Sequence, residues 1–333
     1  GKDKKKAEDL YDALEAFGRY AFNKSHAAVY AAIAYITMYL KYYYPAEFMA
    51  ATIDMDIKSK AKVMRYVNHC KDLGISLLPP DINSSFEHFD PKPDKTISYS
   101  LSAKDTDSKS LKAIIDERDK NGKFVDMTDY FRRCGKSVNK KTFRSLMSIG
   151  AFHSITPDRQ RFIYNADVIY KKLDSIKNAA DRARERGKEP RTTFENSFLL
   201  ESLAPAMNEY TRMELLTREK EFSGSYLTGH PLDKYAFIIN KIHSQELSYL
   251  DYDLEEETGR IVTANHLQKN EQITVIAVVN EIVKTQTRKD GKPMAILTIE
   301  DLTGICKAFA FSKIYPSLSD IMEENQVYEI HGE

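Results

Sequence analysis

The spacing of hydrophobic residues predicts helices at the start of the chain. Leu10, Leu14 and Phe17 recur at helical spacing, and Gly18 is placed to end that helix. An uncharged, largely apolar run follows at 27–40. Because a membrane span needs about 20 residues, this shorter run predicts a buried core helix. We therefore expect the chain to begin as a helical region with one helix in its interior.

Four further amphipathic patterns predict the helices that follow. Their apolar residues are, in order, Val63, Tyr66, Val67 and Cys70; Leu111, Ile114 and Ile115; Phe143, Leu146 and Met147; and Phe162, Ala166, Ile169, Leu173 and Ile176. Gly122 is placed to end the second of these helices, and Gly150 the third. The last helix is expected to give way to a charged linker at 181–191. Between the first two patterns, alternation at Ile97, Tyr99 and Leu101 predicts a short strand.

From residue 271 onward the pattern changes from helical spacing to alternation. The predicted strands are 273–279, 294–299, 305–311 and 327–330, with turns at 289–291 and 301–304 and a helix at 316–324. Several short strands with one helix predict a small barrel of the oligonucleotide-binding (OB) type. Since the chain stops within a strand, we expect that barrel to be truncated. The fold class is therefore α+β and multidomain.

Charge is distributed unevenly along a chain whose total is zero. The 333 residues include 49 basic and 49 acidic ones. Residues 1–190 hold 35 basic and 26 acidic residues, a net charge of +9, and residues 191–333 hold 14 and 23, a net charge of −9. Zero total charge argues against a chain that binds nucleic acid over its whole surface. The split instead assigns nucleic-acid binding to the first part. The three cysteines are widely spaced, which favours a reducing cytoplasm over a disulfide framework.

Six basic residues and no acidic one lie between Tyr130 and Pro157. They are Arg132, Arg133, Lys136, Lys140, Lys141 and Arg144. Such a run can be simply a solvated surface. Its position between two short helices also suits contact with the phosphates of duplex DNA, because loop amides and helix N-termini add donors to the side-chain charge.

Several short strings, in one order along nearly the whole chain, resemble one protein family. They are Phe22-Asn23-Lys24-Ser25-His26-Ala27, Tyr44-Pro45-Ala46-Glu47-Phe48, Leu78-Pro79-Pro80-Asp81-Ile82-Asn83, Gly150-Ala151-Phe152 and Tyr226-Leu227-Thr228-Gly229-His230-Pro231-Leu232. Together they resemble the bacterial DNA polymerase III alpha subunits, which are C-family replicative polymerases. The resemblance implies four parts. These are the end of the fingers at 1–75, a helix-hairpin-helix region with a long helix at 76–190, a linker at 191–270 and the OB domain at 271–333.

The resemblance also implies what the chain does and does not contain. The aspartates that bind Mg²⁺ in the palm of that family would lie upstream of Gly1, so this chain alone is expected not to polymerise, to hold no cofactor and to lack catalytic residues. The partners implied are template–primer DNA, an incoming deoxynucleoside triphosphate, the beta sliding clamp and other subunits of the polymerase III holoenzyme. We expect no membrane contact.

The resemblance suggests site residues in two places and puts a third in question. In the fingers, contact with nucleotide or template–primer is expected from Arg19, Asn23, Lys24, Ser25 and His26. In the linker, Glu195, Phe198 and Leu199 lie where the family carries its clamp-binding motif, with Glu195 in place of the usual Gln. The first hairpin departs from the family because 103–108 reads Ala-Lys-Asp-Thr-Asp-Ser without the usual glycines. DNA binding through that hairpin is therefore in question.

Single-stranded DNA is expected at the loop that carries Arg288, Lys289 and Lys292. Phe309 and Phe311 share one face of a strand, and they could stack on bases or fill the barrel core; the spacing alone favours the core. His230 is expected to be structural. No set of metal ligands or nucleophiles is evident in the sequence.

Two other functions fit the same residues. One is a translesion homologue of the same family, and the other is a non-catalytic module of helix-hairpin-helix and OB domains. Upstream sequence with paired palm aspartates would distinguish a polymerase from the module.

Overall fold

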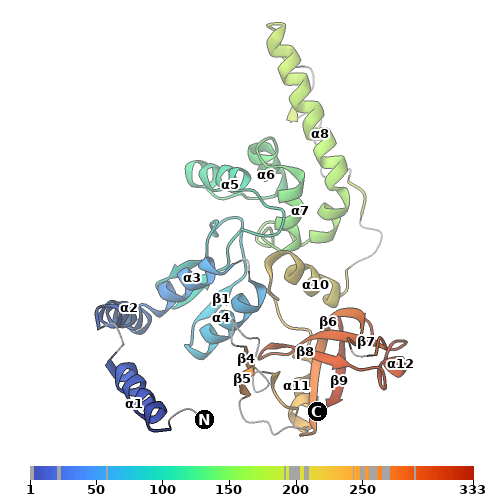
Figure 1. Cartoon of the computed structure of the whole chain (residues 1–333). Helices are drawn as coiled ribbons and strands as arrows, with labels where there is room; N and C mark the ends of the chain where they lie inside the picture. The colour runs from blue at the N-terminus through green and yellow to red at the C-terminus, as the bar shows by residue number, and fades with distance from the viewer. Residues whose placement is uncertain are drawn as a thin grey trace.

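The chain folds into a series of small units that follow one another in sequence (Figure 1). The computed structural model describes residues 4–20, 24–57, 59–190, 193–194, 203–205, 210–242, 244–247, 252–254, 261–264, 271–288 and 290–333. Among these residues, no helix is both long and apolar enough to cross a membrane.

The first two helices are exposed, which corrects two expectations. Helix α1 runs from Lys4 to Tyr20 and does not end at Gly18. Helix α2 (Lys24–Tyr43) contains the uncharged run, yet Ile33 is 51% and Met38 is 72% exposed. Although α2 contacts helix α3, none of its described side chains is buried. An apolar helix is buried only where another element covers it, and no described element covers α2 along its length.

A small mixed unit follows around a three-stranded sheet. It consists of α3 (Pro45–Met55), α4 (Lys60–Asp72), β1 (Ser76–Leu78), β2 (Asp90–Lys92) and β3 (Thr96–Ser98). The strand order is β1-β3-β2, with β1 parallel and β2 antiparallel to β3. The apolar faces of α3 and α4 pack on this sheet through Met49, Ile53 and Val63. The strand expected at Ile97 is therefore present and shorter than its alternation suggested.

The second unit is helical and contains the two hairpins. Its helices are α5 (Ser108–Asn121), α6 (Met127–Cys134), α7 (Lys140–Ser148) and α8 (Arg159–Glu185). Buried aromatic rings, including Tyr130, Phe131 and Phe143, form the centre of its core. Helix α8 continues five residues into the stretch expected to be a linker. A helix that projects into solvent, as the end of α8 does (Figure 1), can carry charged side chains on all sides. A change to an all-charged sequence therefore does not mark where such a helix ends.

The last unit is an antiparallel sheet of four strands. They are β6 (Ile273–Gln286), β7 (Pro293–Glu300), β8 (Ile305–Ala310) and β9 (Gln326–Gly332), in the order β8-β7-β6-β9. The described strands form an open sheet, so closure into an OB barrel remains a prediction. The expected helix at 316–324 is only the short α12 (Tyr315–Leu318). A separate pair joins β4 (Tyr252–Leu254) to β5 (Ile261–Ala264).

Helix α10 (Arg212–Ser223) stands between the hairpin unit and the sheet. It begins with a capping box, in which Thr211 and Glu214 satisfy each other's backbone amides. Its Glu219 is fully buried and accepts hydrogen bonds from Arg159 of α8 at 3.0 Å and from the amides of Leu227 and Thr228 at 3.1 and 3.0 Å. One carboxylate thus fixes both α8 and the loop that follows α10.

Lys220, the next residue, reaches the sheet instead. Its ammonium group donates to the buried carboxylate of Glu300 and to Asn280 Oδ1 at 2.7 Å, and it lies over the ring of Tyr226. The His230 ring lies beside the Glu300 carboxylate, and burial lowers the pKa of the ring to about 4. The neutral ring accepts a hydrogen bond at Nδ1 from the amide of Leu232, at 3.1 Å.

Two glycines allow arginine side chains to approach the backbone closely. Gly150 has φ +79°, and a Cβ there would lie 2.4 Å from the guanidinium of Arg159. Gly229 has φ +148°, and a Cβ there would lie 2.6 Å from the guanidinium of Arg212. Both positions combine a backbone conformation that other residues rarely adopt with the close approach of an arginine.

We predict that Lys220→Met destabilises the sheet by about 3–5 kcal/mol, because it leaves the Glu300 carboxylate buried without its cation. Amide hydrogen exchange in β6 and β7 would measure the loss. The double substitution Lys220→Met with Glu300→Leu should recover most of it. Lys292→Met, which removes an exposed pair with Asp290, is the matched control and should change little. Equal exchange in Lys220→Met and the original chain would contradict the role given to this pair.

Candidate nucleic-acid interface

Two hairpins lie side by side at one face of the helical unit. The first, 103–107, precedes α5, and the second, 135–139, precedes α7. Asp107 caps α5 by accepting from the amide of Ser110 at 2.9 Å, and Asn139 caps α7 by accepting from the amide of Thr142 at 2.9 Å. The two hairpins are thus built alike, each ending in the residue that caps the following helix.

Asp107 also holds the hairpins together. Its carboxylate accepts hydrogen bonds from Thr142 Oγ1, at 2.9 Å, and from the side-chain amide of Asn139. Hydrogen bonds from Ser110, Thr142 and Asn139 keep the pKa of Asp107 below its ordinary value. Asp105 has φ +65°, a conformation that glycine adopts more readily. The glycine-free first hairpin therefore keeps its turn, with one aspartate in the left-handed region and another as a cap.

The predicted basic run separates into structural and exposed cations. Arg133 is structural: its side chain is 14% exposed and donates to Glu117 Oε1 and to Asp129 Oδ2, both at 3.0 Å. It also donates to the carbonyl of Gly122 at 2.7 Å and lies over the ring of Phe124. The hydrogen bond from Arg133 lowers the pKa of Glu117. Its position in the run gave no indication of this role.

Three other members of the run are engaged within the unit. Lys140 and Arg144 donate to the two oxygens of Asp167 on α8, at 2.6 and 2.7 Å, and these bonds lower the pKa of that carboxyl. Arg132 is exposed and lies over the ring of Phe194, 5.5 Å from its centroid. The ion pairs of Lys140 and Arg144 are themselves partly exposed, so both cations remain at the surface.

The remaining two cations, Lys136 and Lys141, are exposed, and within the described part of the chain neither has an ion pair. Lys141 is the second residue of α7, directly beside the N-terminal amides of that helix. Lys109 holds the equivalent position in α5 and is exposed as well. Sequence reasoning did not identify Lys109. The signal for it was the repeated order of cap, one residue, lysine at both hairpins.

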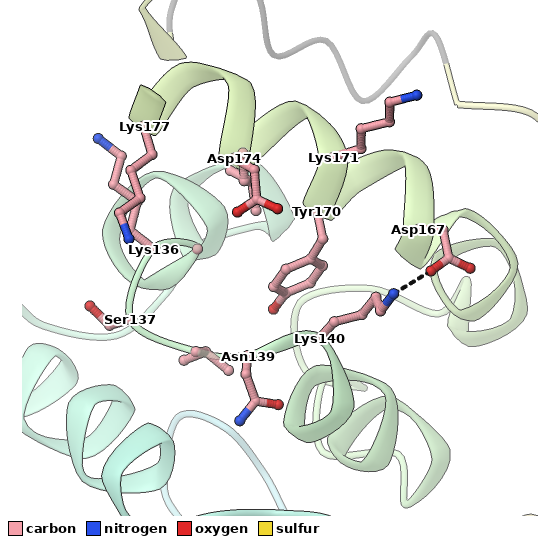
Figure 2. Close-up of a pocket in the computed structure, with 12 residues that line it drawn as sticks. Lys136, Ser137, Asn139, Lys140, Asp167, Tyr170, Lys171, Asp174 and Lys177 are labelled. Atoms are coloured by element: carbon pink, nitrogen blue, oxygen red, sulfur yellow. Dashed lines mark hydrogen bonds and ion pairs between the residues drawn. The ribbon is translucent and has the colours of Figure 1, made fainter. Parts of the chain in front are cut away.

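A cleft lies between the second hairpin and α8 (Figure 2). Its walls carry Lys136 and Lys140 from the hairpin side and Lys171 and Lys177 from α8. The helix residues were not predicted as site residues, although Tyr170, Asp174 and Lys177 recur at helical spacing. A second groove, between the two hairpins, is lined by Asp105, Thr106, Asp107, Asn139, Lys140 and Lys141.

The residues expected in the fingers are not brought together into a site that can be described. Ser25 and His26 are exposed in the first turn of α2, where the His26 ring contacts that of Tyr30 edge-on. Asn23 lies outside the described residues, and so do the side chains of Arg19 and Lys24. The clamp-binding residues Glu195, Phe198 and Leu199 also lie outside them.

The loop predicted to bind single strands is a tight turn between β6 and β7. The amide of Thr287 donates to the carbonyl of Lys292 at 2.8 Å. Lys292 pairs with Asp290 at 2.9 Å, whereas Arg288 is exposed; Lys289 lies outside the described residues. Among the described residues, no three His, Cys, Asp or Glu side chains are grouped so that they could hold a metal ion.

Two phenylalanines on β8 and just after it correct an expectation. Phe309 is 50% and Phe311 is 56% exposed, so neither fills a barrel core. Their rings stack on each other at 6.2 Å with an interplanar angle of 17°. Residues two apart on a strand share a face, and here that face is the one turned to solvent.

Comparison with known proteins finds one family model and a set of relatives that share one name. Residues 74–162 match the family model of the helix-hairpin-helix motif, which covers both hairpins. The whole chain is similar to the DNA polymerase III subunit alpha of Borreliella burgdorferi, with 33% identity over 100% of this chain and 28% of that protein. Identity is 31% to the Thermus aquaticus protein of the same name and 29% to that of Escherichia coli K12, each over 98% of this chain. This chain spans about a quarter of the length of these curated relatives.

We predict that Arg133→Gln destabilises the helical unit by about 2 kcal/mol, because it removes charge-assisted hydrogen bonds to two partly buried carboxylates. Arg132→Gln, with the same loss of charge at an exposed neighbour, should change stability little. Urea unfolding followed by circular dichroism would compare them. Similar midpoints for the two variants would show that Arg133 is not a structural residue.

Proposed function

Because the chain belongs to the family of DNA polymerase III alpha subunits, we propose that it is a DNA-binding segment of such a polymerase, with the paired hairpins as its duplex-binding surface. The observation that carries this proposal is the pair of exposed lysines, Lys109 and Lys141, at the starts of the two helices that follow the hairpins. Each lysine lies beside helix N-terminal amides, which favour anions. Two such positions on one face suit the backbone of a duplex.

The remaining roles are proposed at the level of the whole protein. We infer template-directed DNA synthesis with Mg²⁺ and deoxynucleoside triphosphates, since the relatives are named DNA polymerase III subunit alpha. Binding of the sliding clamp through Glu195, Phe198 and Leu199, contact with other holoenzyme subunits, and inactivity of this chain alone are proposals supported by the sequence. A translesion role or a non-catalytic module would use the same DNA-binding surface.

The duplex-binding proposal predicts the effect of Lys109→Gln with Lys141→Gln. Binding of a labelled duplex should weaken severalfold whatever its sequence, because phosphate contacts carry no base information. The plot of log K against log salt should become less steep by roughly two, since each phosphate contact contributes about 0.9. Fluorescence anisotropy across a salt series gives both quantities.

The matched control is Lys120→Gln with Lys123→Gln. It makes the same change in net charge at and just beyond the opposite end of α5, where both lysines are exposed. An equal effect in the two double variants would mean that only net charge matters. No effect of Lys109→Gln with Lys141→Gln would refute the hairpin surface.

A second function, binding of single-stranded DNA by the sheet, is supported by the exposed, stacked pair Phe309 and Phe311. Aromatic faces at the surface of a sheet give unpaired bases a stacking platform. The nearby turn with Arg288 adds positive charge. This platform differs from the loop-based site expected from sequence, because its contacts come from rings as well as cations.

We predict that Phe309→Ala with Phe311→Ala weakens binding of a labelled oligo-dT by about 1–3 kcal/mol for each stacked base lost, with duplex binding unchanged. Ile321→Ala removes another exposed apolar side chain of the same unit, 62% exposed, and serves as control. Anisotropy titrations with both DNA forms would test this. Undiminished oligo-dT binding would exclude the aromatic pair as a platform.

A further inference from the structure

The cleft between the second hairpin and α8 has a volume of about 480 Å³. Volumes of about 300–1,000 Å³ are typical of sites for small ligands. Its wall on the hairpin side is the loop from Gly135 to Lys140, and its other wall is one face of α8. The family model ends at residue 162, so this face of α8 lies beyond the helix-hairpin-helix motif.

Tyr170 presents a buried hydroxyl group to this cleft. Its side chain comes from α8 and points toward the hairpin loop (Figure 2). The residue is 9% exposed, and among the described residues its hydroxyl oxygen has no hydrogen-bond partner. Burial raises the pKa of this phenol, so it keeps its proton and is a hydrogen-bond donor. A buried donor without an acceptor is costly for a protein, and a ligand that brings an acceptor would satisfy it.

The charges around Tyr170 favour an anion. Lys136, Lys140, Lys171 and Lys177 line the cleft with Asp167 and Asp174, which leaves a net charge of two positive. Lys140 is held by Asp167, and Lys171 extends away from the hairpin (Figure 2). Lys136 and Lys177 lie on the same side of the cleft in Figure 2 and are exposed. An anion that enters between them meets two ammonium groups.

We propose that this cleft binds a phosphoryl group, which Lys136 and Lys177 capture and to which the Tyr170 hydroxyl donates. A phosphoryl group offers several acceptor oxygens, as many as these donors require. Because the Tyr170 hydroxyl oxygen is itself shielded from solvent, the phosphoryl group can reach it only after neighbouring side chains move. The source is either a phosphodiester of bound DNA or a free phosphate. The first case rests on the duplex-binding function proposed above, and the second does not.

The test compares Tyr170→Phe with Tyr164→Phe in the full 333-residue chain. Tyr164 lies on an exposed face of α8, 51% exposed, and is the matched control. Isothermal titration with inorganic phosphate should show roughly tenfold weaker binding in Tyr170→Phe, the usual effect of losing one hydrogen bond to a charged group. Its resistance to urea should be equal or higher, because an unsatisfied hydroxyl is removed. If Tyr170 were only a structural residue, Tyr170→Phe would leave phosphate binding unchanged.

Substitutions of the charged lining residues test whether the cleft prefers an anion or a cation. Lys177→Gln should weaken phosphate binding, whereas Lys172→Gln, five residues earlier on α8 and outside the lining, should not. Asp174→Asn should strengthen it, because a carboxylate that repels the anion is neutralised. Weaker phosphate binding in Asp174→Asn would overturn the proposal, since a cation site would respond in that way.

Duplex DNA identifies the source of the phosphoryl group. If the source is DNA, Tyr170→Phe weakens duplex binding and duplex DNA displaces phosphate; if it is a free phosphate, duplex binding is unchanged. Phosphate and duplex affinities that are both unaltered in Tyr170→Phe would overturn the proposal. Lys141→Gln, which lies outside the cleft, separates the two claims. If Lys141→Gln weakens duplex binding and Tyr170→Phe weakens neither duplex nor phosphate binding, the hairpin function stands and the proposed phosphoryl site does not.

Discussion

The arrangement of this chain depends on two neighbouring residues of α10 that reach in different directions. The carboxylate of Glu219 fixes α8 and the loop after α10, and the ammonium group of Lys220 fixes the sheet through Glu300. Lys104, at the first hairpin, donates to Glu221 of the same helix at 2.7 Å. Buried charges are tolerated only when they are paired and hydrogen-bonded. One turn of α10 therefore sets where the hairpins stand relative to the sheet.

That constraint gives a physical reason for having the two proposed DNA-binding surfaces on one chain. The hairpins present cations suited to the backbone of a duplex, and the sheet presents stacked aromatic rings suited to unpaired bases. Duplex and single strand meet at the junction of a primer and its template. A rigid connection between the two surfaces would keep each on its own side of such a junction. The net charge of +9 on residues 1–190 agrees with duplex binding by the hairpins, whereas the net charge of −9 on residues 191–333 means that binding by the sheet has to rely on its aromatic rings and local cations.

Local patterns in the sequence identified most of the elements, but not all of their ends and not their surroundings. The apolar spacing at Leu111 and Phe143 identified helices that are present, and Gly122, at φ +81°, follows the end of α5 as expected. The same reasoning placed the helix at 27–40 in a core, where the described structure leaves it exposed. Periodicity shows which side chains can be buried, but it does not show what covers them.

The candidate site was predictable in its location and not in its division of labour. A run of six cations pointed to the second hairpin, yet Arg133 binds Glu117 of α5 and Asp129 of its own helix α6. The spacing of four residues between Asp129 and Arg133 is visible in the sequence, whereas the contact with α5 is one that no local pattern reveals. Lys109 and Lys177 were missed because each is isolated in sequence from that run. They belong to the surface only after α5 and α8 are folded against the hairpins.

The central claim is that duplex DNA lies on the face formed by the two hairpins. Acetylation of lysines in the free and DNA-bound chain, quantified residue by residue with mass spectrometry, tests it most directly. The account predicts that duplex DNA protects Lys109, Lys136 and Lys141, while Lys120 and Lys241, on other exposed surfaces, react as in the free chain. Protection of Lys120 and Lys241, with the hairpin lysines still reactive, would contradict it.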